Sequence, residues 1–316
     1  MSDEIIKDLG DGLILRQATV EDTDSLATFN SKIHKNPQDE EPNDFIDQLV
    51  REMMTGKHPT LKASDFTMVI DTKTDKIVSS LNLIPQTWSY DGVEFGVGRP
   101  ELVGTDPEYR RRGLIREQFQ VIHRWSEDRG HKMQAITGIP YYYRQFGYEM
   151  CLNLGGSRVG YRSNIPSLSD GEEEKYFFRP AKPDDIPLIS EIYQIASSRN
   201  LISCVRSEDV WRLEIFGRSE KTTGAWMVIE NADHESLGVV YHPKEIWSPE
   251  LRLWGYELKP GISYLEVTPS LLRYLEKTGL QYAQEKDEIE FQGYYLEFGA
   301  EHPVYDAFPE RMPRIN

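Results

Sequence analysis

Cysteine is scarce in this sequence, and long hydrophobic segments are missing. The two cysteines, Cys151 and Cys204, lie far apart and outside any CxxC pair. This argues against a disulfide framework or a thiolate metal site and is typical of a reducing compartment. No apolar run approaches the ~20 residues that cross a bilayer. The chain starts MSDEIIKDLGDG, which is acidic where a secretory signal has a basic region and an apolar core. We therefore expect a cytoplasmic protein with no membrane contact.

Positive charge is also in short supply. The chain has 36 Lys and Arg against 52 Asp and Glu, a formal net charge of −16. Affinity for nucleic acid comes mainly from neutralising phosphates, so this balance argues against a nucleic-acid partner. It fits a cationic substrate, or simply a well-solvated surface. The seven histidines form no HExxH motif or close pair, so we expect no metal site.

A repeat divides the chain into halves. The segment LRQATVEDTDSLATF at 15–29 aligns with FRPAKPDDIPLISEI at 178–192, with Arg16 opposite Arg179. Each copy reads apolar-Arg-x-Ala, a short turn, an acidic pair and then apolar residues at helical spacing. This pattern predicts a strand, a turn and a helix at the head of each half.

The domain boundary is expected in a polar stretch. Residues 162–175, RSNIPSLSDGEEEK, contain Pro, Gly and three successive glutamates and are typical of a linker. With 316 residues, two domains are the default expectation. We therefore predict a first domain at 1–161 and a second domain at 176–316.

The first half alternates between strand and helix patterns. Strands are expected at 13–17, 66–71, 76–84, 101–105, 132–138 and 149–155, helices at 21–33, 45–54 and 113–128, and a short helical turn at 141–147. Gly130 stands where a helix favours a left-handed closing residue. Such an order predicts the α/β (α+β mixed sheet) fold class, with helices on the sheet faces.

Four arginines gather in residues 106–119, DPEYRRRGLIREQF, where a strand turns into a helix. A helix N-terminus is already positive, so Arg110, Arg111 and Arg112 are unfavourable there unless an anion binds. Together with the helix amides, arginines form a phosphate site, and Gly113 permits close approach of the backbone. GxxxxGK[ST] does not occur, and GVGRPE has only two glycines of a dinucleotide fingerprint. A different kind of phosphate-bearing ligand is indicated.

Two motifs in order resemble a known family. VGTDPEYRRRGLIR resembles the acyl-CoA-binding signature [Q/R]-x-x-G-x-[G/A] of the GNAT superfamily of N-acyltransferases, with Arg110 to Gly113 in its first four positions. Ile115 stands where Gly or Ala is usual, as in the Eis-type (enhanced intracellular survival) branch. YYYRQFGYE resembles the Tyr-x-x-[Leu/Phe]-Gly-[Phe/Tyr] segment, which places Tyr143 at the family's general-acid position.

This resemblance implies two tandem GNAT-like domains, the second degenerate. The stretch EVTPSLLRYLEKTG in the second half occupies the place of the signature and lacks its Arg-Gly turn. Tandem units are an Eis-type trait. The sterol-carrier-like third domain of that branch is not expected in 316 residues.

The resemblance also implies the binding site of acetyl-CoA, the expected co-substrate. The pantetheine arm would lie along the strand backbone, the pyrophosphate against the arginine turn, and the thioester beside the next strand. The implied contacts are Val103, Gly104, Thr105, Arg110, Arg111, Arg112, Gly113, Leu114, Ile115, Arg116 and Ile139.

Catalysis by this family requires an acid and a base. Tyr143 would protonate the departing CoA thiolate, although a packed aromatic with a structural hydroxyl is the alternative. Glu101 is the candidate base, with Glu94 beside it; Eis-type enzymes use the terminal carboxylate, here that of Asn316. Trp88, Tyr90 and the acidic loop 39–44 fit either an acceptor pocket for a cation or a core and a solvated loop.

The expected function is an N-acetyltransferase. It transfers the acetyl group of acetyl-CoA to a primary amine of a small molecule or peptide, by direct attack in a ternary complex. The alternative is a non-catalytic acyl-CoA-binding regulatory or interaction protein, since a fold does not dictate a function. The sequence leaves the acceptor and the oligomeric state open.

Overall fold

The computed structural model describes residues 5–139, 141–153, 155–286, 289–307 and 314–315. It divides into two compact units. Unit 1 comprises Met1–Cys151 and Asn200–Leu213, and unit 2 comprises Leu152–Arg199 and Glu214–Asn316. Each unit thus contains two separate stretches of the chain. The predicted domain bounds at 161 and 176 stay a prediction.

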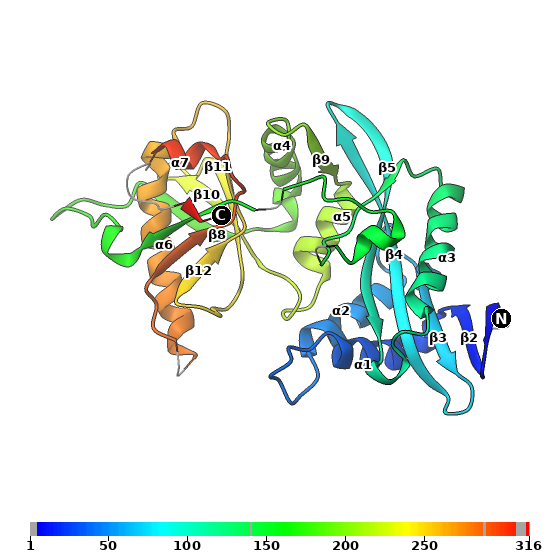
Figure 1. The fold of residues 1–316 in the computed structure, drawn as a ribbon. Coiled ribbons are helices and arrows are strands. Elements are labelled where there is room, and N and C mark those ends of the chain that lie inside the picture. Colours follow the sequence, from blue (N-terminus) through cyan, green and yellow to red (C-terminus); the bar gives the residue numbers. More distant parts are fainter. Residues whose placement is uncertain (1–4, 140, 154, 287–288, 308–313, 316) are drawn as a thin grey trace. The chain divides into compact units, whose positions relative to one another are not determined.

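Unit 1 is built on a seven-stranded mixed sheet (Figure 1). Its strands are β1 Ile5–Gly10, β2 Leu13–Gln17, β3 Phe66–Asp71, β4 Lys76–Tyr90, β5 Val93–Thr105, β6 Met133–Gln134 and β9 Ile202–Val205. The order is β1-β2-β3-β4-β5-β6, and β9 pairs with the far part of β4. All pairings are antiparallel except that of β5 with β6, which is parallel.

Helices cover both faces of this sheet. They are α1 Thr23–Ile33, α2 Asp44–Met54, α3 Leu114–Asp128 and the short α5 Glu208–Arg212. Along β4 the side chains alternate. Leu81 and Leu83 pack with the apolar stripe of α3, whereas Ile84 joins the core under α1 and α2. We call these two sides the α3 face and the α1/α2 face.

Several elements form where the sequence predicts them. The strand at 13–17, the strand at 66–71 and the helix from 114 to 128 are confirmed. Gly130 follows that helix with φ +69°, as expected for its closing residue. The helical turn is confirmed as a 3-10 turn at Tyr143–Phe146.

Two of the strand predictions are wrong. One strand is shorter than predicted, and the other does not form in the described residues. The strand expected at 132–138 is reduced to the two residues of β6. No strand forms in the described part of 149–155; Met150 is 68% exposed there, so its apolar character does not reflect a buried strand. The following strand, β7, pairs within unit 2 instead.

The β4–β5 hairpin is longer than predicted. It extends to an Asp91–Gly92 turn, in which both residues have positive φ (+48° and +81°), and Tyr90 pairs with Val93. An Asp-Gly pair in a two-residue loop matches the twist of a hairpin. This dipeptide was therefore the signal in the sequence for the extra length.

Unit 2 contains two four-stranded sheets. The first has the order β13-β11-β10-β8 and the second β12-β14-β7-β15. The strands are β7 Ser157–Tyr161, β8 Tyr176–Pro180, β10 Ala225–Asn231, β11 Ser236–His242, β12 Glu250–Leu253, β13 Gly255–Leu258, β14 Gly293–Leu296 and β15 Arg314–Ile315. The helices are α4 Ile186–Ser197, α6 Tyr264–Gln284 and α7 Pro303–Ala307. Among the described strands of this unit, β12 and β14 pair in parallel and the other pairs are antiparallel.

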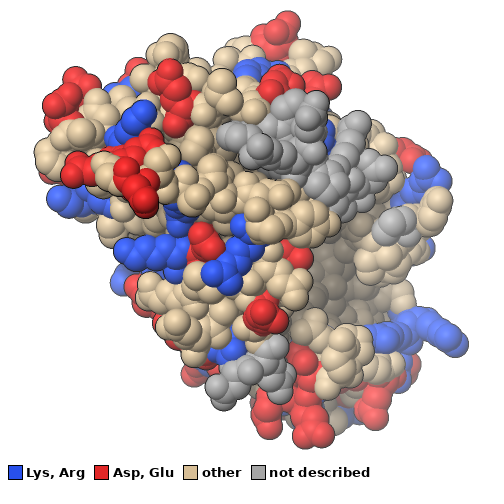
Figure 2. Space-filling view, turned by 90° about the vertical axis from the view of Figure 1, so that its left-hand side faces the viewer, with Lys and Arg blue, Asp and Glu red and all other residues tan. Residues whose placement is uncertain are grey.

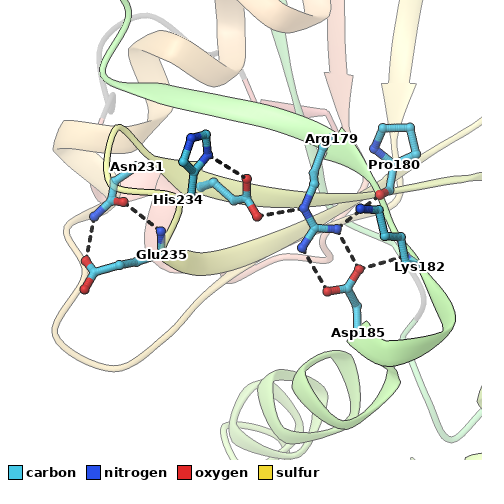
Figure 3. A network of polar contacts seen from close by, with 8 residues as sticks. Arg179, Pro180, Lys182, Asp185, Asn231, His234 and Glu235 are labelled. Carbon is cyan, nitrogen blue, oxygen red and sulfur yellow. Dashed lines mark hydrogen bonds and ion pairs between the residues drawn. The ribbon is translucent and has the colours of Figure 1, made fainter.

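The sequence repeat is also a repeat of local structure. In unit 1 the guanidinium of Arg16 donates two hydrogen bonds to the carboxylate of Asp22, at 2.8 and 2.6 Å. In unit 2 Arg179 does the same to Asp185, at 2.7 and 2.9 Å (Figure 3). Each aspartate also accepts a backbone N–H of its turn, that of Lys182 in the second copy. The ion pair thus fixes the angle at which a helix leaves its strand.

Charge is mixed over the surface despite the acidic total. On the face drawn in Figure 2, Lys and Arg side chains lie among Asp and Glu side chains. Among the described residues, none of the helices has the length and apolar character needed to cross a membrane. The same residues contain no group of three or more His, Cys, Asp and Glu side chains arranged to hold a metal ion.

Asp22→Asn and Asp185→Asn form a matched test of the repeated contact. Arg16 is only 6% exposed, so losing its counter-charge at Asp22 should lower the free energy of unfolding by about 3 kcal/mol. Asp185→Asn should cost less than about 1 kcal/mol, because Arg179 is more exposed and keeps Glu230 at 2.7 Å. Urea denaturation measures both, and equal losses would contradict the role of burial.

The effect of Asp22→Asn should depend on pH. Burial alone would raise the pKa of Asp22, but the hydrogen bonds from Arg16 and Thr19 outweigh it and lower that pKa. Such a carboxylate stabilises the fold above its unfolded pKa and loses this contribution as pH falls through the folded value. The difference between wild type and variant should therefore shrink below about pH 4.

Candidate active site

A bulge interrupts β5 at the centre of unit 1. Ser80 faces Gly104 and Asn82 faces Glu101, so two residues, Leu102 and Val103, stand opposite the single residue between them on β4. Leu102 has φ +52°, a left-handed conformation that a non-glycine residue adopts only under constraint from its surroundings. Bulges of this kind bend a strand and redirect its side chains beside functional sites.

The edge of β5 that pairs with β6 has no partner strand among the described residues over the same stretch. Parallel pairing joins only Val97 with Met133 and Gly98 with Gln134, and the Ala135 N–H then donates to the Gly98 carbonyl at 3.1 Å. From residue 99 to 105 the described pairing of β5 is with β4 alone. The backbone there has no second partner strand among the described residues, and a ligand contact at Val103, Gly104 and Thr105 stays a prediction.

The arginine turn follows at the end of this open edge. A 3-10 turn at Pro107–Tyr109 leads into it, Arg111 has φ +64° and Gly113 has φ +76°. The first helical bond that reaches back to the turn runs from the Glu117 N–H to the Gly113 carbonyl, at 3.1 Å. The preceding amides have no acceptor within a helix, which is the condition for anion binding. The side chains of Arg110, Arg111, Arg112 and Arg116 are exposed.

Buried polar contacts hold the turn in place. The Tyr109 hydroxyl donates to Asp71 at 2.6 Å, which lowers the pKa of Asp71 and raises that of Tyr109. On the α3 face, Gln118 donates to the Ser79 hydroxyl at 2.7 Å, and Ser79 donates to the Gly104 carbonyl at 3.0 Å. Strand end, turn and helix are therefore linked through side chains that a ligand does not touch.

Leu114 and Ile115 have their side chains in the core. They are 4% and 9% exposed, and Ile115 packs with Leu81, Leu83 and Phe119. Only their backbone can face a ligand. The inward direction explains why an aliphatic residue is accommodated at Ile115, where the resembling signature has Gly or Ala.

Tyr143 lies against the α3 face and is half-buried. Its ring packs edge-on to Phe119, and a Cβ built on Gly138, in the segment after β6, would come within 2.3 Å of it, so glycine there leaves room for the ring. Burial, with smaller effects from Tyr142 and Glu101, raises the pKa of Tyr143 to about 12. Tyr141 and Tyr142 are 76% and 37% exposed. Of the three tyrosines, Tyr143 is the one enclosed beside the open edge.

The two candidate bases occupy different places. Glu101 stands on the bulged part of β5, forms an ion pair with Arg99 and lies close enough to affect the pKa of Tyr143. Glu94 is seven residues further along β5, about 20 Å away at strand spacing, and pairs with Ser89 near the hairpin turn. The structure therefore separates Glu94 from the arginine turn. Asn316 lies outside the described residues.

Other expected contacts are exposed or distant. Ile139 is 68% exposed and follows β6. Trp88 and Tyr90 lie at the hairpin end of β4, where β9 pairs with them, and are thus away from the bulge. The acidic loop before α2 is exposed.

Sequence reasoning missed two side chains beside the bulge, His34 and Asn82. The only signal was the pattern of SSLNLI in β4, where Ser80 and Asn82 are polar at positions that face α1. Polar residues at alternate sites normally indicate a solvent-facing side. Here that side is buried beneath a helix, which the sequence does not reveal.

Together these features define a mixed α/β unit with an open-edged, bulged strand and a cationic turn. Residues 15–151 match the family model described as "Acetyltransferase (GNAT) domain". This segment of the chain is thus similar to a GNAT acetyltransferase domain, and it carries the bulge, the arginine turn and Tyr143. A comparison with curated proteins gives no significant match.

Solved structures share the fold over nearly the whole chain. A conserved protein of unknown function from Enterococcus faecalis V583, described as a probable N-acyltransferase, has a TM-score of 0.62 at 12% identity, covering 96% of this chain and 70% of that one. A GCN5-related N-acetyltransferase from Kribbella flavida has a TM-score of 0.62 at 16% identity, with coverage of 96% and 70%. N-myristoyltransferase from Saccharomyces cerevisiae with bound myristoyl-CoA gives 0.62 at 13%, with coverage of 93% and 78%.

Ile115→Ala tests whether this signature position serves the core. Because its side chain is 9% exposed, the substitution should lower the free energy of unfolding by about 2–4 kcal/mol. Gln120→Ala, at an exposed site on the same helix, should change it by less than about 0.5 kcal/mol. Urea denaturation is the measurement. An Ile115→Ala variant as stable as its control would show that this side chain does not support the fold.

Proposed function

We propose that the protein is an N-acetyltransferase that transfers the acetyl group of acetyl-CoA to a primary amine of a small molecule or peptide. One observation carries the proposal: the open edge of β5 ends at a turn of exposed arginines, inside the segment that matches the GNAT domain. An extended thioester ligand with a charged diphosphate suits that combination. The sparse cysteines and acidic surface support a cytoplasmic location.

Coenzyme A would bind along the edge and the turn. Its pantetheine amides would pair with the backbone of Val103, Gly104 and Thr105 as an added strand. Its diphosphate would lie on the amides from Arg111 to Arg116, with the guanidinium groups of the turn providing charge-assisted hydrogen bonds. Ile139 would flank the thioester. The buried polar contacts of Ser79 and Tyr109 keep this surface preorganised.

The reaction needs an unprotonated amine. An alkylamine with a pKa of about 10.4 is only ~0.04% neutral at pH 7, a cost of about 4–5 kcal/mol. Once a base has removed the proton, the nitrogen lone pair attacks the thioester carbon, the C–S bond breaks and the sulfur keeps the electron pair. The amides of the β5 bulge would stabilise the charge that the carbonyl oxygen gains.

Tyr143 would provide the proton for the sulfur. With a pKa of about 12 it remains protonated over the working range. A free thiol titrates near 8.5, so transfer to a thiolate in water would be uphill by roughly 5 kcal/mol. In the enclosed site, burial raises the basicity of the thiolate as it does that of the phenolate, which narrows the gap. Hydrogen bonding from Tyr143 to the leaving sulfur begins before the transfer is complete.

We further propose that the chain consists of two tandem GNAT-like domains, with a linker at 162–175 and a second domain lacking the CoA signature. Three features support this. The arginine–aspartate turn recurs. The sheet order β8-β10-β11-β13 corresponds to the order β2-β3-β4-β5 in unit 1. Each unit also has a parallel strand pair, β12 with β14 and β5 with β6. In unit 2 the corresponding strand, β13, has its Glu257 engaged by Tyr264 at 3.0 Å and Arg199 at 2.5 Å. Side chains of the protein thus occupy that region.

Arg111→Gly tests the diphosphate site. Glycine keeps the left-handed backbone while the guanidinium is lost, so we expect CoA to bind about tenfold more weakly, whereas pantetheine, which lacks the diphosphate, binds unchanged. Isothermal calorimetry measures both ligands. Arg124→Ala, at an exposed site further along α3, serves as the control. Unaltered CoA affinity in Arg111→Gly would place the diphosphate elsewhere.

Tyr143→Phe tests the proton donor. We expect kcat to fall by about 100-fold while CoA affinity stays the same, because general acid catalysis contributes at least that much. Tyr141→Phe, at the exposed neighbour, should retain wild-type turnover. The assay follows CoA release from acetyl-CoA with polyamines, aminoglycosides and lysine peptides, and myristoyl-CoA is compared as donor. Binding of CoA without turnover of any acceptor would favour the non-catalytic acyl-CoA-binding alternative.

A further inference from the structure

Asn82 is an unsatisfied polar side chain in the centre of unit 1. It is 0% exposed, and neither its amide oxygen nor its amide nitrogen has a hydrogen-bond partner among the described residues. Its neighbours on the α3 face, Leu81 and Leu83, are in the apolar core, so Asn82 projects to the α1/α2 face. A buried amide without partners is costly and calls for a water molecule or a ligand group.

His34 presents a second unsatisfied atom to the same region. It caps the C-terminus of α1, and its Nε2 is buried without a hydrogen-bond partner among the described residues. The ring lies against the bulge of β5: a Cβ built on Gly104 would come within 3.3 Å of Nε2. The backbone of Leu102 also lies within reach of the ring and favours its charged form.

The two unsatisfied groups converge on one stretch of β5. Asn82 pairs across the sheet with Glu101, and His34 covers the next residues, Leu102 to Gly104. A side chain at Gly104 would also collide with Ile33, at 2.7 Å, so glycine is what lets α1 bring His34 this near. Both groups therefore adjoin residues 101–104 of β5 from the same face of the sheet, where a water molecule can serve both.

A neighbouring pair shows that polar groups under α1 are otherwise matched. One turn before His34, Asn30 accepts a hydrogen bond from Ser80 at 3.3 Å and donates to the Leu26 carbonyl at 2.9 Å. Ser80 is two residues before Asn82 on the same face of β4. The fold thus satisfies one polar pair at this interface and leaves open the pair that adjoins the bulge.

We propose that His34 is the proton acceptor for the substrate amine, acting through a water molecule that Asn82 holds. This inference rests on the proposed transferase function. It assigns the deprotonation step to the α1/α2 face of the bulge, opposite Tyr143 on the α3 face. Glu101, opposite Asn82 on β5, is already engaged by the guanidinium of Arg99.

The step balances as follows. The ammonium of the acceptor gives its proton to the bridging water, and that water gives one of its own protons to Nε2 of His34. The freed nitrogen lone pair then forms the N–C bond as the C–S bond breaks and Tyr143 protonates the sulfur. The nitrogen, now positively charged, releases its second proton, which restores the proton that Tyr143 gave up. His34 must begin with its proton on Nδ1, so that Nε2 is the acceptor. The imidazolium later returns its proton to solvent.

The charge of the surroundings suits a neutral base. Burial, opposed by the Leu102 carbonyl, lowers the pKa of His34, so the ring is uncharged at neutral pH and does not repel an ammonium group. Charged residues next to His34 in the chain are Lys32, in the last turn of α1, and Lys35, and the Arg99–Glu101 ion pair lies on β5. Lys35 donates to the Glu40 carbonyl and is held in the loop.

His34→Gln separates this role from a structural one. With an alkylamine acceptor at pH 7, kcat should fall at least 100-fold, and the log of the rate should rise with pH at unit slope. Wild type should reach a plateau above the pKa of His34. Hydrazine is unprotonated at pH 7 in substantial amount. With this acceptor, the kcat values of wild type and His34→Gln should differ less than threefold. His131→Gln, a half-buried histidine that contacts Ser126, is the matched control and should behave as wild type.

Asn82→Leu provides the second test. Replacing an unsatisfied buried amide by an apolar group should leave the urea midpoint unchanged or raise it, while alkylamine turnover falls at least tenfold. Asn82→Ala is measured in parallel. It removes the same amide and leaves a side chain smaller than the native one, so that a misfit of leucine does not decide the result. A purely structural role predicts the reverse, lower stability with turnover retained.

The outcomes distinguish this inference from the function on which it rests. If wild type acetylates no amine, the proposed function fails. If wild type is active and His34→Gln matches it in rate and pH profile with alkylamines, the transferase stands and His34 is not the base. Equal losses with alkylamine and hydrazine would likewise overturn the assignment, because they would show general damage to the site.

Discussion

The site depends on one departure from regular strand pairing, the bulge in β5. Where two residues of β5 oppose one of β4, Leu102 is held at positive φ. The features of the candidate site gather around this point. The edge of β5 that pairs with β6 has no described partner from residue 99 on, Glu101 and Gly104 flank the bulge, and the arginine turn follows the end of the strand.

Two layers of side chains keep that departure stable. On the α3 face, Gln118 and Ser79 connect helix, sheet and the Gly104 carbonyl through hydrogen bonds, and Tyr109 secures the turn to Asp71. On the opposite face the packing of α1 leaves no room for a side chain at Gly104. The polar side chains in these contacts on the α3 face all have hydrogen-bond partners. The α1/α2 face contains Asn82 and His34, whose unpaired polar atoms among the described residues are the ones that the proposed deprotonation step uses.

Local patterns predicted a large part of this arrangement. The helix from 114 to 128, its arginine turn and the aromatic turn at Tyr143 are each fixed by residues close in sequence, and the order of the two motifs indicated the family. Residues 149–155 were mistaken for a strand because strand formation depends on a partner strand, and the apolar residues of this segment do not identify one. His34 and Asn82 were missed for a related reason. Their proximity results from the register of β4 on β5 and from the packing of α1, neither of which is encoded in a short window.

The recurrent arginine–aspartate turn has a consequence for how the chain reaches its fold. The contact joins residues six positions apart, so closing it costs little loop entropy and can precede the long-range pairing of the sheets. Each half thereby possesses its own early nucleus, a strand and helix already set at the correct angle. The same short-range contact thus gives both units a local starting point for folding that does not depend on what either surface binds.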